Sequence, residues 1–305
     1  MRIKFISKLL LLLAIVSLHA DQNSLQPLDC GDYTFSRIGI QHLEHKGMGF
    51  NQGYSTVSLF AAPLTQTLPF IDGRLHVFNS GELAANGGFG LRYSNKKETF
   101  LIGFNTYYDY RHHENLTTQQ ISGGIEFLSR RFDFRLNGYY PFYEKYKVKL
   151  NPFTNRQTLR YALASADTSL GITLPAPCDE IGLYLELGYY YLFDQRAYYG
   201  NSNFNTKGSS SIGSSSGGRA RLNCNPTDYI GFGVEYTFDH LFGSRFNGFL
   251  AFNIPLGPKK LLHSTKNRYP YEKSPCDLHY EWKKIQTQSV LRNPIIPMIT
   301  KRKSV

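Results

Sequence analysis

The sequence predicts an all-β protein, a twelve-stranded antiparallel transmembrane β-barrel. Three observations predict it: apolar and polar residues alternate over segments of strand length, aromatic residues and glycine are frequent, and the chain begins with an export signal. Of 305 residues, 22 are Tyr, 22 are Phe and 27 are Gly, a composition that favours strands and tight turns. The mean hydropathy of −0.34 disfavours helical membrane spans but suits a barrel, because only every second strand residue faces lipid.

The first 20 residues are typical of a secretory signal peptide. Basic residues precede an apolar run at 9–16, which is too short to span a bilayer as a helix, and Ala20 offers a cleavage site. A retained membrane anchor is the alternative, and the short apolar run disfavours it. Residues 21–33 are then expected to form a short periplasmic N-terminal segment.

The alternation has a period of two. Phe100, Ile102 and Phe104 fall on one face of a segment whose other face carries Asn105 and Asp109. Similar segments recur along the chain at lengths near the roughly 9–11 residues that a tilted strand needs to cross a bilayer. The twelve predicted strands span residues 34–44, 52–61, 72–80, 83–94, 98–111, 117–128, 131–141, 160–173, 180–195, 217–225, 228–239 and 244–256.

The chemistry of the two faces distinguishes a membrane barrel from a soluble one. The polar face is rich in glycine and carries charges of both signs, whereas the apolar face is bulky, with Tyr and Phe near strand ends. This pattern fits lipid outside, aromatic girdles at the interfaces and a polar lumen. The residues predicted to face the lumen are Arg92, Asp109, Glu126, Asp133, Arg135, Glu186 and Glu235.

The connections between the predicted strands indicate an orientation. Those after the fourth, sixth, eighth and tenth strands are short, whereas the two longest, 142–159 and 196–216, follow the seventh and ninth strands and so lie at the other end of the barrel. Outer-membrane barrels have short periplasmic turns and longer outer loops, so we expect a periplasmic N-terminus and these two loops outside. The Ser- and Gly-rich region 200–218 is predicted to be a flexible loop.

No feature predicts a catalytic, cofactor or metal site, and we expect no enzyme activity. His112 and His113 are adjacent, so in a strand their side chains point apart and chelate poorly. No strand presents the His and Ser pair that a phospholipase would need. No close cysteine pair indicates a zinc or redox motif, and unpaired thiols are the default expectation. The four cysteines are Cys30, Cys178, Cys224 and Cys276.

The charge is strongly positive, +11 overall, with many basic residues in the segment 258–305. Export makes nucleic acid an improbable partner, so we expect contact with anionic outer-membrane lipid or lipopolysaccharide. We also hypothesise that this basic tail occupies the lumen. The acidic lumen residues that would then be available to pair with it are Glu126, Asp133, Glu186 and Glu235.

Several motifs, taken in order, resemble a known family. They are Gly-Phe-Gly-Leu-Arg-Tyr at 88–93, Leu-Ile-Gly-Phe-Asn-Thr-Tyr-Tyr-Asp at 101–109, Gly-Gly-Ile-Glu-Phe at 123–127, Phe-Arg-Leu-Asn-Gly-Tyr-Tyr-Pro at 134–141, Asp-Thr-Ser-Leu-Gly at 167–171, Leu-Asn-Cys-Asn-Pro at 222–226 and Ile-Gly-Phe-Gly-Val-Glu at 230–235. Together, over roughly residues 50–257, they resemble the translocator barrel of the inverse autotransporters, the intimin and invasin family.

The resemblance implies a barrel at 34–257 in the outer membrane of a Gram-negative bacterium, inserted by the barrel-assembly machinery. In that family a linker threads the pore and leads to an adhesive passenger, and residues 288–296 are similar to the family's motif after the barrel. Because the chain ends at Val305, we expect a structural or secretion role without a passenger on this chain. A small outer-membrane pore with exposed loops and a soluble secreted lipid-binding barrel remain alternatives.

Overall fold

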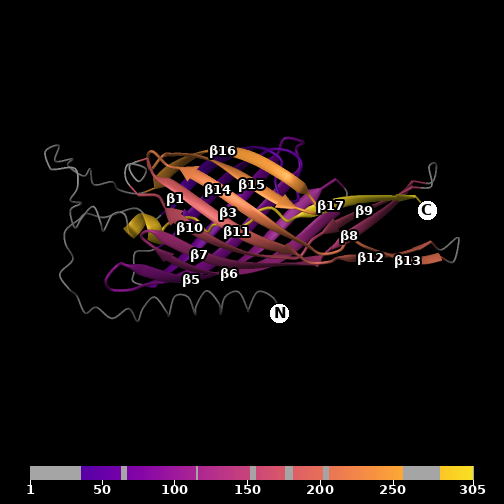
Figure 1. Cartoon of the computed structure of the whole chain (residues 1–305), viewed down its shortest axis with the longest axis horizontal. Coiled ribbons are helices and arrows are strands. Elements are labelled where there is room, and N and C mark those ends of the chain that lie inside the picture. The colour runs from indigo at the N-terminus through magenta and orange to yellow at the C-terminus, as the bar shows by residue number, and fades with distance from the viewer. Residues whose placement is uncertain are drawn as a thin grey trace.

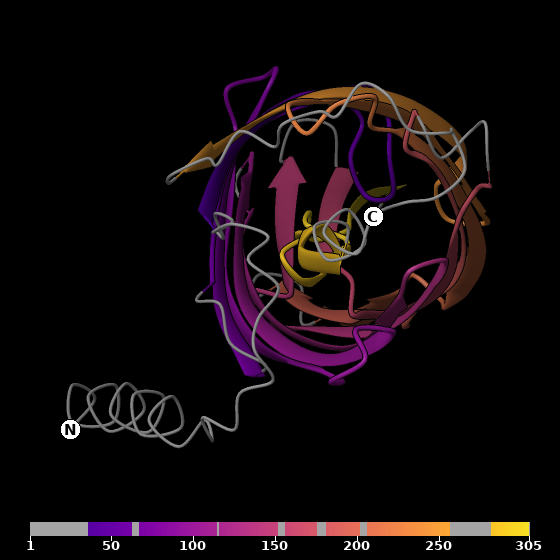
Figure 2. The ribbon, with the colours of Figure 1, turned by 90° about the vertical axis from the view of Figure 1, so that its left-hand side faces the viewer.

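Twelve strands close into an antiparallel barrel in the computed structural model, which confirms the predicted fold class (Figures 1 and 2). The structure describes residues 36–62, 67–114, 116–151, 156–175, 181–201, 206–256 and 282–304. The barrel strands are β1 (Ser36–His45), β2 (Tyr54–Ala61), β3 (Thr67–Phe78), β4 (Leu83–Ser94), β5 (Phe100–His113), β6 (Leu116–Ser129), β7 (Phe132–Tyr143), β10 (Ser165–Thr173), β11 (Leu183–Leu192), β14 (Ser215–Cys224), β15 (Ile230–Asp239) and β16 (Gly243–Leu256). The ring closes where Ser36 of β1 pairs with Leu256 of β16.

Five further strands lie outside the barrel wall. β8 (Tyr146–Asn151), β9 (Arg156–Ala162) and β17 (Met298–Ser304) form a three-stranded sheet with β9 in the middle. β12 (Arg196–Asn201) and β13 (Thr206–Ser211) form a hairpin. Both units extend from the same end of the barrel (Figure 1). We call this the long-connection end, and the opposite end, where the β4–β5, β6–β7 and β14–β15 connections lie, the short-turn end.

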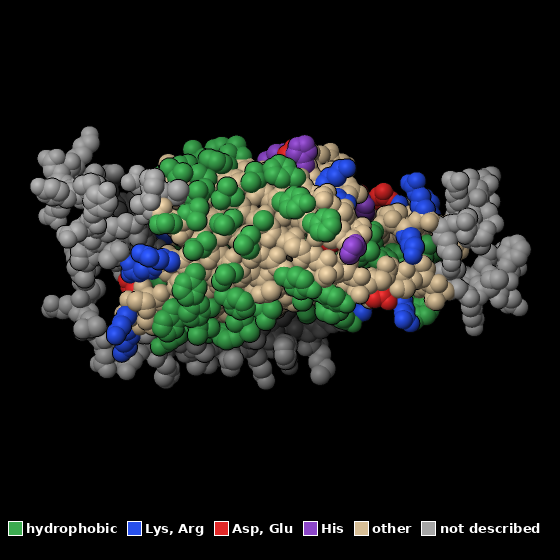
Figure 3. All heavy atoms as spheres, in the orientation of Figure 1, with side chains coloured by type: hydrophobic (Ala, Val, Ile, Leu, Met, Phe, Trp, Pro, Cys, Tyr) green, Lys and Arg blue, Asp and Glu red, His purple; other side chains and the backbone are tan. Residues whose placement is uncertain are grey.

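The wall turns its apolar face outward. Along β7, Phe132, Phe134 and Leu136 are exposed, whereas the intervening Asp133 and Arg135 are buried. Figure 3 shows the same exposed apolar side chains spread over the barrel surface. A soluble barrel would bury this face, so the exterior argues for lipid around the wall and against a soluble lipid carrier. No helix among the described residues is long and apolar enough to cross a bilayer.

β3 begins five residues before the predicted start at residue 72. The added residues include Pro69, which cannot donate a ladder hydrogen bond. In the structure Pro69 pairs with Leu91 of β4, whereas the pairing of β3 with β2 ends at Ile71 and Ala61. The proline therefore lies where β3 has a described neighbour on one side only, which is where a strand tolerates it.

The predicted strand 160–173 is wrong because two strands occupy it. β9 ends at Ala162 and pairs with β8 and β17, whereas β10 starts at Ser165 and pairs with β7 and β11. Alternation continues through both because Leu159 and Tyr161 of β9 are also buried, in an apolar cluster with Met48. The period-two pattern predicts which side chains are buried, but it does not predict which strand a segment pairs with.

The predicted flexible loop 200–218 is also largely wrong. β13 and the start of β14 lie in it, since a serine-rich backbone still pairs with a neighbour. The turn between them is held by Asp194, whose Oδ1 accepts from the Ser211 hydroxyl (2.5 Å) and the Gly213 amide (2.9 Å). These contacts place the pKa of the Asp194 carboxyl below its usual range.

Some predictions fall on residues that the structure does not describe. The signal peptide, the segment 21–33 and three of the cysteines, Cys30, Cys178 and Cys276, lie outside the described residues. Cys224 is buried, has no disulfide partner among the described residues, and donates its thiol hydrogen to the Ile181 carbonyl.

Candidate functional site

Residues 282–297, which we call the luminal segment, run inside the barrel (Figure 2). The segment begins with a short helix at 282–286. Trp282 lies at the short-turn end, where its indole Nε1 donates to Ser94 Oγ at 2.9 Å and its ring packs on Leu101 and Leu128. At the other end, β17 follows directly and pairs with β9. The segment therefore crosses the lumen from one end to the other.

Three wall arginines hold the segment by its backbone carbonyls. Arg92 Nη1 donates to the Gln286 and Gln288 carbonyls at 2.6 and 2.7 Å. Arg74 Nη2 donates to the Val290 carbonyl at 2.8 Å. These two arginines are also fixed by carboxylates, Arg92 by Glu126 and Arg74 by Asp72, so their guanidinium groups are already oriented toward the segment.

The third of these arginines, Arg111, lies nearer the long-connection end. Its Nη1 donates to the Ile296 carbonyl at 2.5 Å and to the Gly49 carbonyl at 2.9 Å. Gly49 belongs to the β1–β2 connection, and its carbonyl also accepts from the Met298 amide. The connection and the segment thus share one arginine, which joins them where the segment leaves the lumen.

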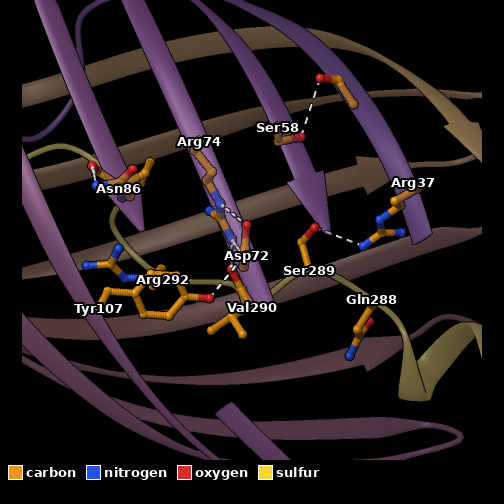
Figure 4. Close-up of polar contacts among 12 residues, drawn as sticks. Arg37, Ser58, Asp72, Arg74, Asn86, Tyr107, Gln288, Ser289, Val290 and Arg292 are labelled. Carbon is orange, nitrogen blue, oxygen red and sulfur yellow. Dashed lines mark hydrogen bonds and ion pairs between the residues drawn. The ribbon is translucent and has the colours of Figure 1, made fainter. Parts of the chain in front are cut away.

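Arg292 of the luminal segment forms a buried ion pair with the wall. Its two terminal nitrogens donate to the two carboxylate oxygens of Asp109 at 2.8 and 2.6 Å, and Nη2 also reaches Ser122 Oγ. The guanidinium lies over the ring of Tyr107 (Figure 4), with its carbon 4.2 Å from the ring centroid. The same carbon lies 5.4 Å from the ring centroid of Tyr139. This pair is fully desolvated, with about 1% of each side chain exposed. The two parallel bonds form only when the guanidinium and the carboxylate face each other in one plane. The pair therefore fixes the register of the segment in the barrel.

A chain of polar side chains extends from Asp109 to β2. Asn86 Nδ2 donates to Asp109 Oδ1 and to the Pro294 carbonyl, both at 2.8 Å. Asn86 Oδ1 therefore accepts, and its partner is His76 Nε2 at 2.7 Å. His76 Nδ1 then faces the Thr56 hydroxyl, also at 2.7 Å. The orientation of the Asn86 amide assigns the proton of His76 to Nε2.

The seven residues predicted to face the lumen lie on the side of the wall opposite to the exposed apolar face. Six of them, all but Glu235, are buried, and Glu235 is half-buried. Only two of the seven, Arg92 and Asp109, contact the luminal segment through hydrogen bonds. The other five form ion pairs with residues of the barrel wall.

The four carboxylates expected to pair with the basic tail have other partners among the described residues. Glu126 pairs with Arg92, and Asp133 with Arg135. Glu186 lies 3.1 Å from Arg219, and Glu235 pairs with Arg221. For Glu186 and Glu235 the cations come from the neighbouring strand β14, where pairing places Arg221 opposite both carboxylates. Arg135 lies on the same strand as Asp133, and Arg92 of β4 reaches across β5 to Glu126 of β6. The carboxylates that pair with the segment are instead Asp109, with Arg292, and Asp228 of the β14–β15 turn, with Lys284.

Several functional residues were missed by the sequence reasoning. Arg37, Arg74, Asn86, Arg111 and Tyr139 all contact the segment. The signal was available for some of them, since Arg111 and Tyr139 continue the polar faces that include Asp109 and Asp133. His112 and His113 share no partner: their Nδ1 atoms face Thr117 and Glu82 respectively.

A closed, twelve-stranded barrel with an apolar exterior and a charged interior defines an outer-membrane β-barrel, and here a segment of the same chain lies in its lumen. The sequence profile of the inverse autotransporter β-domain matches residues 41–203. That is more than half of the chain, and the protein belongs to this family. The resemblance noted in the sequence is thereby confirmed.

Comparison with solved structures supports the fold. A structure described as "Unveiling the Mechanism Behind the in-meso Crystallization of Membrane Proteins" is 15% identical, with a TM-score of 0.59 over 87% of this chain and 100% of that chain. More distant are KdgM porin (8% identity, 71% and 98% coverage, TM-score 0.42) and the translocator domain of autotransporter NalP from Neisseria meningitidis (11% identity, 75% and 91% coverage, TM-score 0.32). No curated protein sequence matches the chain.

Proposed function

We propose that the protein is a non-catalytic translocator barrel that carries its own chain through the outer membrane. The observation that carries this proposal is the path of the luminal segment. It is bound at Trp282 near the short-turn end, at Arg292 within the lumen and at Met298 where β17 begins. A chain held along this path passes from one face of the membrane to the other.

The mode of binding suits a barrel that handles polypeptide. Arg74, Arg92 and Arg111 donate to backbone carbonyls, which every residue of a passing chain offers. Arg292 is different because only arginine forms its two-pronged pair with Asp109. The general contacts would bind an extended chain of any sequence, and the Arg292 pair would stop it in one register.

The direction of passage follows from the barrel ends. We place the short-turn end in the periplasm, together with the start of β1, because outer-membrane barrels keep short turns there and longer loops outside. The luminal segment then enters from the periplasm, and β17, the three-stranded sheet and the β12–β13 hairpin lie at the cell surface. The exposed basic side chains Lys147 and Lys149 of this sheet would face the phosphates of lipopolysaccharide.

Measurements of channel conductance test whether the luminal segment blocks the passage of ions through the barrel. The full chain in a planar bilayer is expected to stay closed, and deletion of residues 258–305 to give steady open channels. If the deletion fails to assemble, Arg292→Gln replaces it and is expected to show frequent openings, with Lys97→Gln in the exposed β4–β5 turn as the matched control. Equal conductance of the full chain and both variants would contradict the proposal, and steady conductance of the full chain would favour a small pore.

Labelling of intact cells tests the orientation separately. Lys147 in β8 and Lys97 at the short-turn end are both exposed. Our orientation puts Lys147 at the cell surface and Lys97 in the periplasm, and each is replaced by cysteine in a separate variant. A membrane-impermeant maleimide is expected to label the first on intact cells and the second only after permeabilisation. The reverse pattern would place the N-terminus outside.

A further inference from the structure

The luminal segment lies against one side of the wall and leaves part of the lumen unfilled on the other side. Among the described residues, its hydrogen bonds and ion pairs with the wall run to β1 and to β3–β7, apart from an ion pair at the short-turn end between Lys284 and Asp228. On the side of β14–β16 a cavity of about 830 Å³ remains between the segment and the wall. Lys283 and Asp228 line it at the short-turn end, and Met48 and Tyr190, both buried, line it toward the other end.

The lining of this cavity is rich in cations. Among the described residues that line it are seven Arg and Lys side chains and two carboxylates. Five of the cations are paired with carboxylates, some of which lie behind them in the wall: Arg74 with Asp72, Arg219 with Glu186, Arg221 with Glu235, Lys284 with Asp228 and Arg292 with Asp109. Within the described residues, Arg37 and Lys283 have no carboxylate at ion-pair distance.

Arg37 is the better placed of the two. Its Nη2 donates to Ser289 Oγ at 2.8 Å, and its guanidinium carbon lies 5.5 Å from the ring centroid of Phe60 (Figure 4). The nearby carboxylate of Asp72 is taken by Arg74 and by the Tyr107 hydroxyl. A guanidinium has five N–H donors, and within the part of the chain that the structure describes Arg37 uses one of them, on a neutral hydroxyl. A confined cation with unused donors is stabilised by a bound anion.

We propose that this cavity is an oxyanion-binding site in the lumen, with Arg37 as its anchor and the Ser289 hydroxyl beside it. Its ligands are small solutes that carry a phosphate or carboxylate group and enter from the short-turn end. The surrounding excess of basic side chains disfavours cations, and neutral solutes lack the charge-assisted bonds. The site requires the luminal segment to lie where the structure places it, and it does not depend on export.

Equilibrium titration of the folded full chain in detergent tests this site, with inorganic phosphate as the probe at constant ionic strength. Calorimetry is expected to show one saturable site. Acetate should compete with phosphate and glucose should not, and the relative affinities of phosphate and acetate distinguish the two sources of the oxyanion. Phosphate binding without saturation would overturn the proposal as nonspecific screening by the positive charge of the chain.

Variants identify the anchor. Arg37→Gln is expected to weaken phosphate binding at least tenfold, Arg37→Lys to restore part of the loss, and Lys97→Gln, which removes the same charge from the exposed turn, to leave the affinity unchanged. Unchanged affinity in Arg37→Gln would overturn the assignment. If that variant does not fold, Ser289→Ala takes its place because Ser289 lies outside the wall, and unchanged affinity there would also overturn the assignment.

Discussion

At the scale of single residues, arginine carries most of the contact between the wall and the luminal segment. Arg74, Arg92 and Arg111 each combine a fixed position in the wall with donors left over for a carbonyl. Lysine could not do this, since its ammonium has no rigid fork to hold two acceptors in defined directions. Asp109 is the counterpart: Asn86, Gln120, Ser122 and Arg292 all donate to it.

Replacing Arg292 by Gln should cost about 3 kcal/mol of unfolding free energy, because it leaves the buried Asp109 without its cation. This is the low end of the range for a broken buried pair, since other donors still reach the carboxylate. Urea unfolding in lipid vesicles, followed by the heat-modifiable gel shift, measures the loss. Adding Asp109→Asn to Arg292→Gln should recover part of it, and additive losses in the double variant would show that the two residues do not interact.

The sequence predicts which side chains face inward much better than it predicts their partners. Period-two alternation placed Asp109 and Glu126 on the polar face, because that position depends on the local backbone alone. The contact of Asp109 with Arg292 joins residues 183 positions apart and depends on the path of the segment. Charge complementarity indicated an acidic partner for the tail, but arginines of the wall already pair with the four carboxylates that it favoured.

At the scale of elements, the β1–β2 connection closes onto the segment at a glycine. Gly49 has a φ of +79°, a conformation that L-residues rarely adopt, and a Cβ there would meet the Pro297 backbone. Gly81, in the β3–β4 connection, has a similar φ of +83° but open space around it. The two positions therefore separate the cost of the backbone conformation from the cost of contact with the segment.

Gly81→Ala is expected to lower the unfolding free energy by about 1 kcal/mol, the cost of a left-handed alanine. Gly49→Ala should cost clearly more and should also displace the segment, because the added methyl group and Pro297 cannot occupy the same place. Urea unfolding measures the first effect, and channel openings in a planar bilayer measure the second. Equal behaviour of the two variants would show that the connection does not seal against the segment.

The elements themselves were predictable to the extent that their causes are local. β4 matches its predicted bounds because a tight turn and regular alternation define both of its ends. β9 and β10 were merged because their separation depends on β17, which lies more than 130 residues away in the sequence. β13 was missed because its serines give no apolar periodicity, although its backbone pairs fully with β12.

At the scale of the whole molecule, the apolar exterior and the polar interior require a membrane around the wall. Leu187 in β11 is 56% exposed, with Leu185 and Tyr189 beside it on the same outward face. Tyr198 in β12 is 65% exposed, but it belongs to the hairpin beyond the barrel wall. In water the two side chains would be equivalent. In a bilayer only Leu187 faces hydrocarbon, whereas the hairpin remains in the aqueous phase.

Leu187→Arg is therefore expected to lower the unfolding free energy in lipid vesicles by about 2–4 kcal/mol, the cost of an arginine facing the bilayer centre. Tyr198→Arg should change it by less than about 0.5 kcal/mol, as a surface substitution does. Leu187→Ala controls for lost side-chain contacts and should cost less than Leu187→Arg. The same free energies for both arginine variants would mean that the wall around Leu187 faces water, and the membrane-spanning assignment of β11 would then fail.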